Sequence, residues 1–445
     1  MSILARRAVI AVSFAAFLAG TAPAQLLQGL PRVQLPPVGV AGDANVPVVG
    51  PVLQDLLDQP ETRQVVQPTL DSVAGLTPAL ADAGYATLLE LRKLRLRELV
   101  RQNSRELEWD AVGQPVRRGV LVAMDPDSAS LQQAVRGGFR IVADERPDDL
   151  GLRVITLAIP RGLNAPKGLK RLKSVAPNLD ADFDHLFEPA GSTLLPFAGT
   201  LAAAQTRTGG PLLGMIDGGV ASHPSLAGAS IEQSGFSGSA QPTGHGTAVA
   251  SLLVGDQGPF RGAARGASLL VADVYGGSRA AGSATAVVRA LGWLASKRVS
   301  VINISLVGPQ NRILARAIQS VRGRGIGIVA AVGNDGPAAP PQYPAAYPGV
   351  LAITGVDARG RALPEAGKAI HLDFAAPGAD MAAALPGQGY AKVRGTSFAA
   401  PLAAARLALA GPQRLAGEAM PGRGRVGRGI LCGTCRSDPR ALRAK

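Results

Sequence analysis

The sequence predicts an α/β fold, in which helices cover both faces of a parallel sheet, preceded by a smaller α+β domain. Short apolar runs of the length of buried strands recur between residues 212 and 332. These runs are Leu212–Ile216, Ser268–Val274, Val299–Leu306 and Ile326–Val332. Two intervals between them carry apolar residues at helical spacing, namely Val287, Leu291 and Leu294, and then Leu314, Ile318 and Val321. Strands and helices that alternate in this way predict a parallel sheet with both faces covered.

Residues 118–188 predict the smaller domain, because their elements follow the βαββαβ order of the split-βαβ, or ferredoxin-like, arrangement. The expected elements are a strand at Gly119–Met124, a helix at Ser128–Val135, strands at Phe139–Ala143 and Arg153–Ile159, a helix at Lys167–Val175 and a weak strand at Asn178–Phe187. Small residues dominate 191–204, so we expect 189–204 to be a linker to the main domain, which spans about 205–430.

The first 24 residues have the pattern of a secretory signal peptide. Arg6 and Arg7 give a basic start, Ala8–Leu18 form a short apolar core, and Ala22-Pro23-Ala24 fits a cleavage site. This core is too short for a membrane span and no later apolar run reaches that length, so we expect no transmembrane helix and no stable membrane anchor. The expected location is periplasmic or secreted.

Residues 25–117 are expected to hold a Pro-rich leader and a basic helix. Residues 25–82 are rich in Pro, Val and Gln with little periodicity, which is typical of a mostly disordered segment. The Leu- and Arg-rich stretch Leu88–Val100 predicts a basic helix. We expect it to pack against the next domain, and a helix lying on a membrane surface is the alternative.

The chain has 445 residues and a formal net charge of +14. Its basic residues, mostly Arg, are spread along the sequence, and aromatic residues make up only 4% of it. A nucleic-acid-binding protein gathers basic residues into a patch or motif, so we predict no nucleic-acid function. Attraction to other anionic surfaces stays open.

Four polar residues stand where α/β folds place their functional groups. Asp217 ends the first apolar run and Asn334 follows the last one, and ligands bind beyond the carboxyl ends of such strands. His245 and Ser397 each open an apolar helical pattern, where backbone N–H groups favour negative charge. A serine hydroxyl needs an imidazole to take its proton, and the imidazole needs a carboxylate to orient it. Alone, Asp217 and Asn334 would each be turn residues; the set together predicts nucleophilic catalysis.

Five phrases run from about Gly214 to Ala405, namely MIDGGVASHPSL, GHGTAVASLL, VINISLVGP, AAVGNDGP and GTSFAAP. Their order and spacing resemble those of the subtilisin-like serine peptidases, or subtilases. The resemblance implies a subtilisin-like sheet and a catalytic Asp–His–Ser triad of Asp217, His245 and Ser397, in the chain order of that family. It also implies that Asn334 belongs to the oxyanion hole.

The same resemblance suggests how polypeptides bind. An extended substrate is expected to add beside a strand of five residues by main-chain hydrogen bonds. These residues are Ile304, Ser305, Leu306, Val307 and Gly308. Val307 replaces a common glycine of the family, so we expect a preference for small or medium side chains before the cleaved bond. Residues 118–188 resemble, in position and pattern, a propeptide that assists folding and blocks the cleft, which would make the chain a zymogen.

The sequence lacks the motifs of other kinds of catalytic site and of metal sites. An α/β-hydrolase needs a GxSxG elbow and a His after the Ser, but the last His is His371. No HExxH is present, and four scattered His with two Cys give no metal-ligand cluster, so we expect no cofactor. Structural calcium stays open, because its ligands cannot be placed. We expect structural roles for His185, His223 and His371.

Cys432 and Cys435 form a lone CxxC in the 431–445 tail. In an exported chain this favours a small disulfide over a zinc site. The sequence as a whole predicts an exported serine endopeptidase that acts through an acyl-enzyme. The alternative is a non-catalytic scaffold or binding protein that keeps the fold.

Overall fold

The computed structural model describes residues 78–442, apart from 148–149, 191, 198–208 and 388. The expected signal peptide, 1–24, and the expected leader up to residue 77 lie outside the described residues. The chain divides into two compact units, Met1–Arg95 and Leu96–Lys445. Helix α4 (Pro78–Gln102) begins in the first unit and ends in the second. Among the helices that the structure describes, none is long and apolar enough to cross a bilayer.

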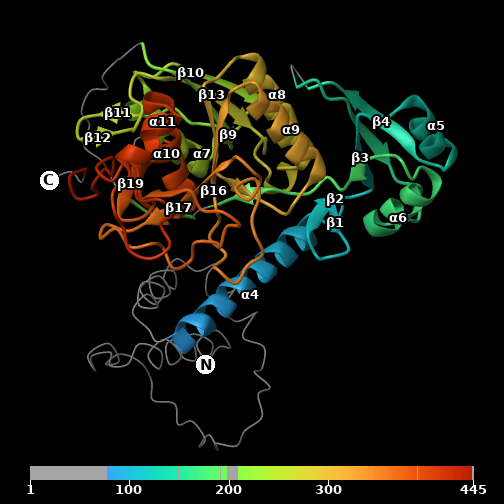
Figure 1. The fold of residues 1–445 in the computed structure, drawn as a ribbon, viewed down its shortest axis with the longest axis horizontal. Coiled ribbons are helices and arrows are strands. Elements are labelled where there is room, and N and C mark those ends of the chain that lie inside the picture. The colour runs from blue at the N-terminus through green and yellow to red at the C-terminus, as the bar shows by residue number, and fades with distance from the viewer. Residues whose placement is uncertain (1–77, 148–149, 191, 198–208, 388, 443–445) are drawn as a thin grey trace, which may run out of the picture. The chain divides into compact units, whose positions relative to one another are not determined.

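Seven parallel strands form the largest sheet of the second unit (Figure 1). In spatial order they are β10 (Ile231–Gly235), β13 (Ser268–Asp273), β9 (Leu212–Asp217), β14 (Val301–Ile304), β16 (Gly327–Ala331), β17 (Leu351–Val356) and β18 (Phe374–Pro377). Every neighbouring pair runs parallel. The predicted α/β class is therefore confirmed.

Helices cover both faces of this sheet, because successive residues of a buried strand point to opposite sides. The helices are α7 (Gly244–Val254), α8 (Ala284–Ser296), α9 (Arg312–Gly323), α10 (Thr396–Ala410) and the short α11 (Pro412–Leu415). Leu213 and Met215 of β9 share an apolar cluster with residues of α7 and α10. Ile216 belongs to the opposite cluster, with residues of α8 and α9. In Figure 1, α8 and α9 accordingly lie together, on the other side of the sheet from α7 and α10.

The smaller domain has the predicted βαββαβ order. Its elements are β3 (Val120–Met124), α5 (Ser128–Arg136), β4 (Arg140–Glu145), β5 (Val154–Ala158), α6 (Ala165–Val175) and β6 (Ala181–Asp182). The antiparallel sheet has the order β4-β5-β3-β6. One face packs on α5 and α6 through residues such as Leu121 and Leu172. From the other face, Val122 and Val154 join the cluster that contains α8 and α9, so this sheet packs against the larger domain.

Several short strands arise where the sequence did not predict them. They are β1 (Leu107–Trp109), β2 (Pro115–Arg117), β7 (Glu188–Pro189), β8 (Ser192–Phe197), β11 (Asp256–Gln257), β12 (Phe260–Arg261), β19 (Met381–Ala384) and β20 (Tyr390–Arg394). By contrast, β15 (Leu306–Val307) lies within the predicted substrate-binding strand, 304–308. The hairpin β1–β2 lies within the expected leader, 25–117. The expected linker, 189–204, is more than a connector: β7 pairs with β15 and β8 with β20. These pairs are formed by main-chain hydrogen bonds, which small residues can also make. A segment of small residues can therefore pair as a strand although its sequence has no apolar periodicity.

The last turn of α4 packs against the next domain, as expected of the basic helix. Val100 is buried in a cluster with Leu107 of β1, Leu186 and Ala280. Near the other end of the chain, Cys432 and Cys435 are joined by a disulfide with a Cα–Cα distance of 5.1 Å. Cys432 belongs to the main core cluster and Cys435 packs against it, so this local link lies on the core.

Candidate active site

Asp217 is the last residue of β9, at the carboxyl edge of the parallel sheet. Its side chain is fully buried, and Oδ1 accepts a hydrogen bond from Gly218 N at 2.7 Å. The same oxygen lies 2.8 Å from Nδ1 of His245. A carboxylate can only accept, so Nδ1 carries the ring proton and Nε2 keeps its lone pair. His245 is therefore ready to accept a proton at Nε2.

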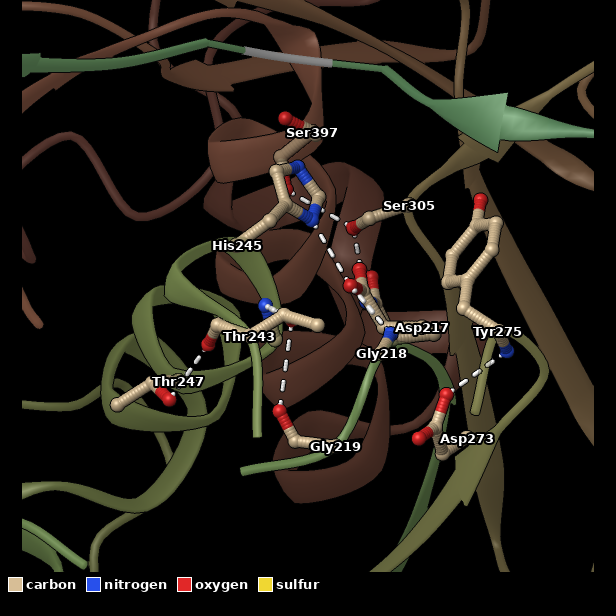
Figure 2. A network of polar contacts seen from close by, with 12 residues as sticks. Asp217, Gly218, Gly219, Thr243, His245, Thr247, Asp273, Tyr275, Ser305 and Ser397 are labelled. Atoms are coloured by element: carbon tan, nitrogen blue, oxygen red, sulfur yellow. Dashed lines mark hydrogen bonds and ion pairs between the residues drawn. The ribbon is translucent and has the colours of Figure 1, made fainter. Parts of the chain in front are cut away.

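The first turn of α7 holds His245 against Asp217. Thr243 caps this helix, because its Oγ1 accepts a hydrogen bond from Gly246 N at 2.9 Å. A Cβ at position 246 would lie only 2.2 Å from Gly218 O, so glycine is required for the helix to approach the loop after β9. Figure 2 shows Thr243, Gly218 and Gly219 grouped below the ring of His245. The local sequence thus fixes the imidazole position.

Ser397 is the second residue of α10, and its side chain is buried. Within the described part of the chain, neither Ser397 Oγ nor His245 Nε2 has a hydrogen-bond partner. In Figure 2 the ring of His245 lies between the side chains of Asp217 and Ser397. Buried polar atoms are normally paired, so two unpaired atoms of complementary kind indicate a functional rather than a structural role. A hydroxyl and an imidazole lone pair placed in this way can exchange a proton during a reaction.

A buried side-chain relay anchors the helix turn that carries Ser397. Pro401 lies four residues further along α10 and has no N–H, so it cannot donate to the carbonyl of Ser397. Ser305 Oγ fills that place and donates to Ser397 O at 2.9 Å. Asn303 Nδ2 in turn donates to Ser305 Oγ at 3.0 Å. The proline inside the helix is thereby tolerated, and the main chain at Ser397 is tied to the segment after β14.

Ser305→Ala is expected to lower both stability and turnover, because it leaves the buried Ser397 carbonyl unpaired. An unsatisfied buried acceptor costs about 1–3 kcal/mol. We expect a drop in the free energy of unfolding of this size and a lower kcat from misplacement of Ser397. Ser296→Ala is the matched control, since Ser296 Oγ also donates to a helix carbonyl, that of Trp293, but in α8. Equal kcat values for the two variants would contradict an anchoring role.

Asn334 follows β16, and both its amide oxygen and its amide nitrogen form hydrogen bonds. Its Oδ1 accepts a hydrogen bond from Thr396 N at 2.9 Å, which orients Nδ2. Nδ2 donates to the main-chain carbonyl of Ala190, and Ser397 N donates to the same oxygen at 3.3 Å. Two N–H groups therefore converge on one carbonyl oxygen beside the Ser397 hydroxyl. Such a pair can stabilise negative charge that develops on that oxygen when the carbonyl carbon is attacked.

The strip of residues expected to hold a substrate is occupied by the chain itself. Leu306 pairs with Pro189 and Val307 with Glu188, in antiparallel register. Ser305 O accepts a hydrogen bond from Ala190 N at 2.9 Å. The other two residues of the predicted substrate-binding strand pair with other parts of the chain. Ile304 is buried in β14, where it pairs with Ile216 and Ala330, and Gly308 bridges to Tyr343.

Tyr275 was not predicted from the sequence, yet it contacts the same segment. Its hydroxyl donates to Phe187 O at 3.0 Å. Burial, together with the nearby carboxylates of Asp217 and Glu188, raises the pKa of Tyr275 well above its ordinary value. The phenol therefore stays protonated and keeps donating at high pH. No sequence signal could have found this contact, because Tyr275 lies just after a strand in a turn without a recognisable motif.

The remaining histidines have structural partners. His185 Nε2 lies 3.3 Å from Asp110 Oδ2 and its Nδ1 lies 3.0 Å from Asn311 Nδ2. His223 Nδ1 accepts a hydrogen bond from Ser225 N, and His371 Nε2 lies 3.0 Å from Val350 O. Among the described residues, no group of three or more His, Cys, Asp or Glu side chains could hold a metal ion.

Comparison with known proteins gives a consistent result. The model of the "Subtilase family" matches residues 208–415. Subtilisin Savinase from Lederbergia lenta is 32% identical over 206 residues, which cover 45% of this chain and 76% of that protein. The Major intracellular serine protease of Bacillus subtilis (strain 168) is 34% identical over 174 residues, or 37% of this chain and 54% of that protein.

The structural comparison covers a larger share of this chain than the sequence comparisons do. Fervidolysin from Fervidobacterium pennivorans, a keratinolytic enzyme related to subtilisin, matches with a TM-score of 0.60 at 18% identity. The match covers 72% of this chain and 61% of that one. At this identity it concerns the fold, and it agrees with the sheet and helix arrangement in Figure 1.

Proposed function

The chain belongs to the subtilase family and is a serine endopeptidase, and we propose from this that Asp217, His245 and Ser397 carry out its reaction. Ser397 Oγ attacks the carbonyl carbon of the scissile peptide bond and passes its proton to His245 Nε2. Asp217 holds the imidazole in the required tautomer and stabilises the imidazolium. The bond between Asp217 Oδ1 and His245 Nδ1, at 2.8 Å, supports these roles.

One observation gives this proposal its strongest support. Asn334 Nδ2 and Ser397 N donate to a single carbonyl oxygen, next to a buried serine hydroxyl that has no partner of its own among the described residues. These donors hold the oxyanion of the tetrahedral intermediate, where charge develops. His245 then gives its proton to the leaving amine, which leaves an acyl-enzyme on Ser397. Water, activated by His245, hydrolyses that ester and restores the serine.

We further assign the 118–188 domain as an inhibitory propeptide. Its sheet packs against the helices of the larger domain through Val122 and Val154. At the end of this domain, Glu188–Pro189 pairs with β15 and blocks the strand beside which other polypeptides would bind. In this arrangement the chain is a zymogen, and its first partner is its own propeptide.

The enzyme is proposed to act outside the cytoplasm, in the periplasm or as a secreted protein, on polypeptide substrates. The support is the N-terminal pattern of a basic start, an apolar core and Ala22-Pro23-Ala24. No cofactor takes part in the proposed reaction.

The competing function is a non-catalytic scaffold or binding protein, and the occupied cleft with its fully buried Ser397 favours it. A fluorophosphonate probe separates the two, because only an activated serine reacts. We expect the purified protein to hydrolyse casein and to carry the label on the peptide that contains Ser397, while the Ser397→Ala variant does neither. A folded wild-type protein that is neither labelled nor active even after limited proteolysis has removed the 118–188 domain would favour the scaffold.

Val307→Gly is expected to widen the preference for the residue before the cleaved bond. Val307 Cγ1 would lie 3.4 Å from a Cβ on Gly333, the residue preceding Asn334, and Val307 shares an apolar cluster with Ala190. Pocket changes of a few methyl groups alter kcat/KM by roughly 10- to 200-fold. We expect a gain of this order for peptides with Phe or Tyr at that position and little change for Ala. An unchanged peptide-library profile would remove Val307 from the pocket.

A further inference from the structure

Glu365 and Arg394 form a buried ion pair beside the residues that are proposed to hold the oxyanion. Arg394 Nη2 donates to Glu365 Oε2 at 2.8 Å, and Arg394 Nε lies 2.7 Å from Oε1. The Arg394 side chain is 11% exposed and that of Glu365 is 10% exposed, so solvent screens their attraction little. Two parallel contacts set the relative orientation of the two groups as well as their distance. The pair is therefore a well-defined link between the two segments that carry it.

Arg394 stands at the start of the turn that carries the nucleophile. It ends β20 and is followed by Gly395, Thr396 and Ser397, which lead into α10. Gly395 has a φ of 140°, a conformation that residues with a side chain rarely adopt. Its N–H donates to Gly378 O at 2.8 Å, which holds the turn against the sheet. Because the turn is so short, a shift of Arg394 would move the main chain of Ser397 as well.

Glu365 lies against the loop that carries Asn334. The main-chain oxygen of Glu365 accepts a hydrogen bond from Gly336 N at 2.9 Å. Two residues further along, Gly367 N donates to Gly333 O, also at 2.9 Å. The segment that carries Glu365 therefore holds the loop both before and after Asn334. A substitution at Glu365 leaves these two contacts available, because main-chain groups make them.

The loop of Asn334 and the turn of the nucleophile are also joined directly. Gly333 N donates to Thr396 Oγ1 at 3.1 Å, and Thr396 N donates to Asn334 Oδ1 at 2.9 Å. With the ion pair, the segments that follow β16, β17 and β20 are each bound to the other two. Stabilisation of an oxyanion requires Asn334 Nδ2 and Ser397 N to keep one relative position. A displacement of about 1 Å in such a site can cost about 100-fold in rate.

We propose that Glu365 and Arg394 are positioning residues for the reaction, which fix the distance between the two oxyanion donors, Asn334 Nδ2 and Ser397 N. This inference rests on the proposed function. The pair acts through the loop and the turn that it joins, and neither side chain is assigned a contact with substrate. Weakening the pair should lower kcat by about 10- to 100-fold and leave KM nearly unchanged, because the oxyanion exists only in the transition state.

The first test compares this pair with a second ion pair, near the other end of α10. Arg406 Nη2 lies 2.7 Å from Glu418 Oε1, and Arg406 Nε donates to Oε2 at 2.8 Å. We expect Glu365→Gln to lower kcat as stated, and Glu418→Gln, the matched control, to keep kcat within about two-fold of wild type. Turnover of one peptide is divided by the amount of serine that a fluorophosphonate labels at completion, so that only folded enzyme is counted. Equal kcat values for the two variants would overturn the proposal.

Replacing both partners separates positioning from stability. Glu365→Leu combined with Arg394→Met removes both charges together, and apolar residues of similar size often replace a buried ion pair without loss of stability. This double variant should unfold near the wild-type temperature and still show the loss in kcat. Arg394→Lys keeps the charge but not the two parallel contacts, so its kcat should lie between those of the wild type and the double variant. A double variant with wild-type kcat would contradict the proposal, since directional contacts would then not be needed.

The last test asks whether the pair acts through the amide of Asn334. The kcat values of the wild type, Glu365→Gln, Asn334→Ala and the variant with both changes form a double-mutant cycle. Without the amide its distance no longer matters, so Glu365→Gln should cost no more than about three-fold in the Asn334→Ala background. Losses that multiply would show a general effect on the fold and overturn the proposal. If Asn334→Ala kept its kcat, or if the wild type hydrolysed no peptide even after removal of the 118–188 domain, the proposed function would fail instead.

Discussion

Ser397→Ala is expected to abolish peptide hydrolysis and leave the fold intact. The loss in kcat should be about 10⁶-fold, the value that removal of the nucleophile causes in subtilisin, a relative in this family. Alanine fits the site, because Ser397 Oγ makes no hydrogen bond with any described residue, so the change leaves no new unpaired group. Thermal unfolding and circular dichroism of the variant should therefore match those of the wild type.

Adding His245→Ala to this variant gives a sharper test of the triad. If Ser397 and His245 act as one unit, the double variant should lose little more activity than either single variant, because the same proton transfer is removed each time. The measurement is kcat on one peptide for all four proteins. Losses that multiply would show that the two side chains act independently, and near-wild-type turnover in Ser397→Ala would make the assignment of the nucleophile wrong.

Much of the fold follows from sequence periodicity. The four apolar runs, which begin at Leu212, Ser268, Val299 and Ile326, correspond to β9, β13, β14 and β16, because strands buried on both faces are apolar at every position. Helix α9 was predictable from Leu314, Ile318 and Val321, which are all buried on one face. The small domain was predictable for the same reason, since each of its elements keeps the period of its own secondary structure.

The occupant of the cleft was not predictable. Glu188–Pro189 has no strand pattern, and the segment after it is made of small residues. Its pairing with β15 depends on hydrogen bonds to residues more than a hundred positions away, which leave no local signal. The contact made by Asn334 was not predictable for the same reason. Its position after the last apolar run and within the phrase AAVGNDGP predicted a functional role, but its contact with Ala190, 144 residues away in the chain, left no local signal.

Asn334→Ala is expected to reduce kcat by roughly 10²–10³-fold, the loss found on removing the equivalent donor in subtilisin, with little change in KM. The amide acts on charge that exists only in the transition state, so ground-state binding loses little. The variant also removes Oδ1, the acceptor for Thr396 N, and this could shift the first turn of α10. Asn334→Asp separates the two effects, because a carboxylate keeps an acceptor for Thr396 N but cannot donate to an oxyanion.

Both variants should therefore lose kcat if donation by Nδ2 is what matters. If Asn334→Asp kept most of the activity, the contribution of Asn334 would lie in holding the α10 turn, and Ser397 N alone would bind the oxyanion.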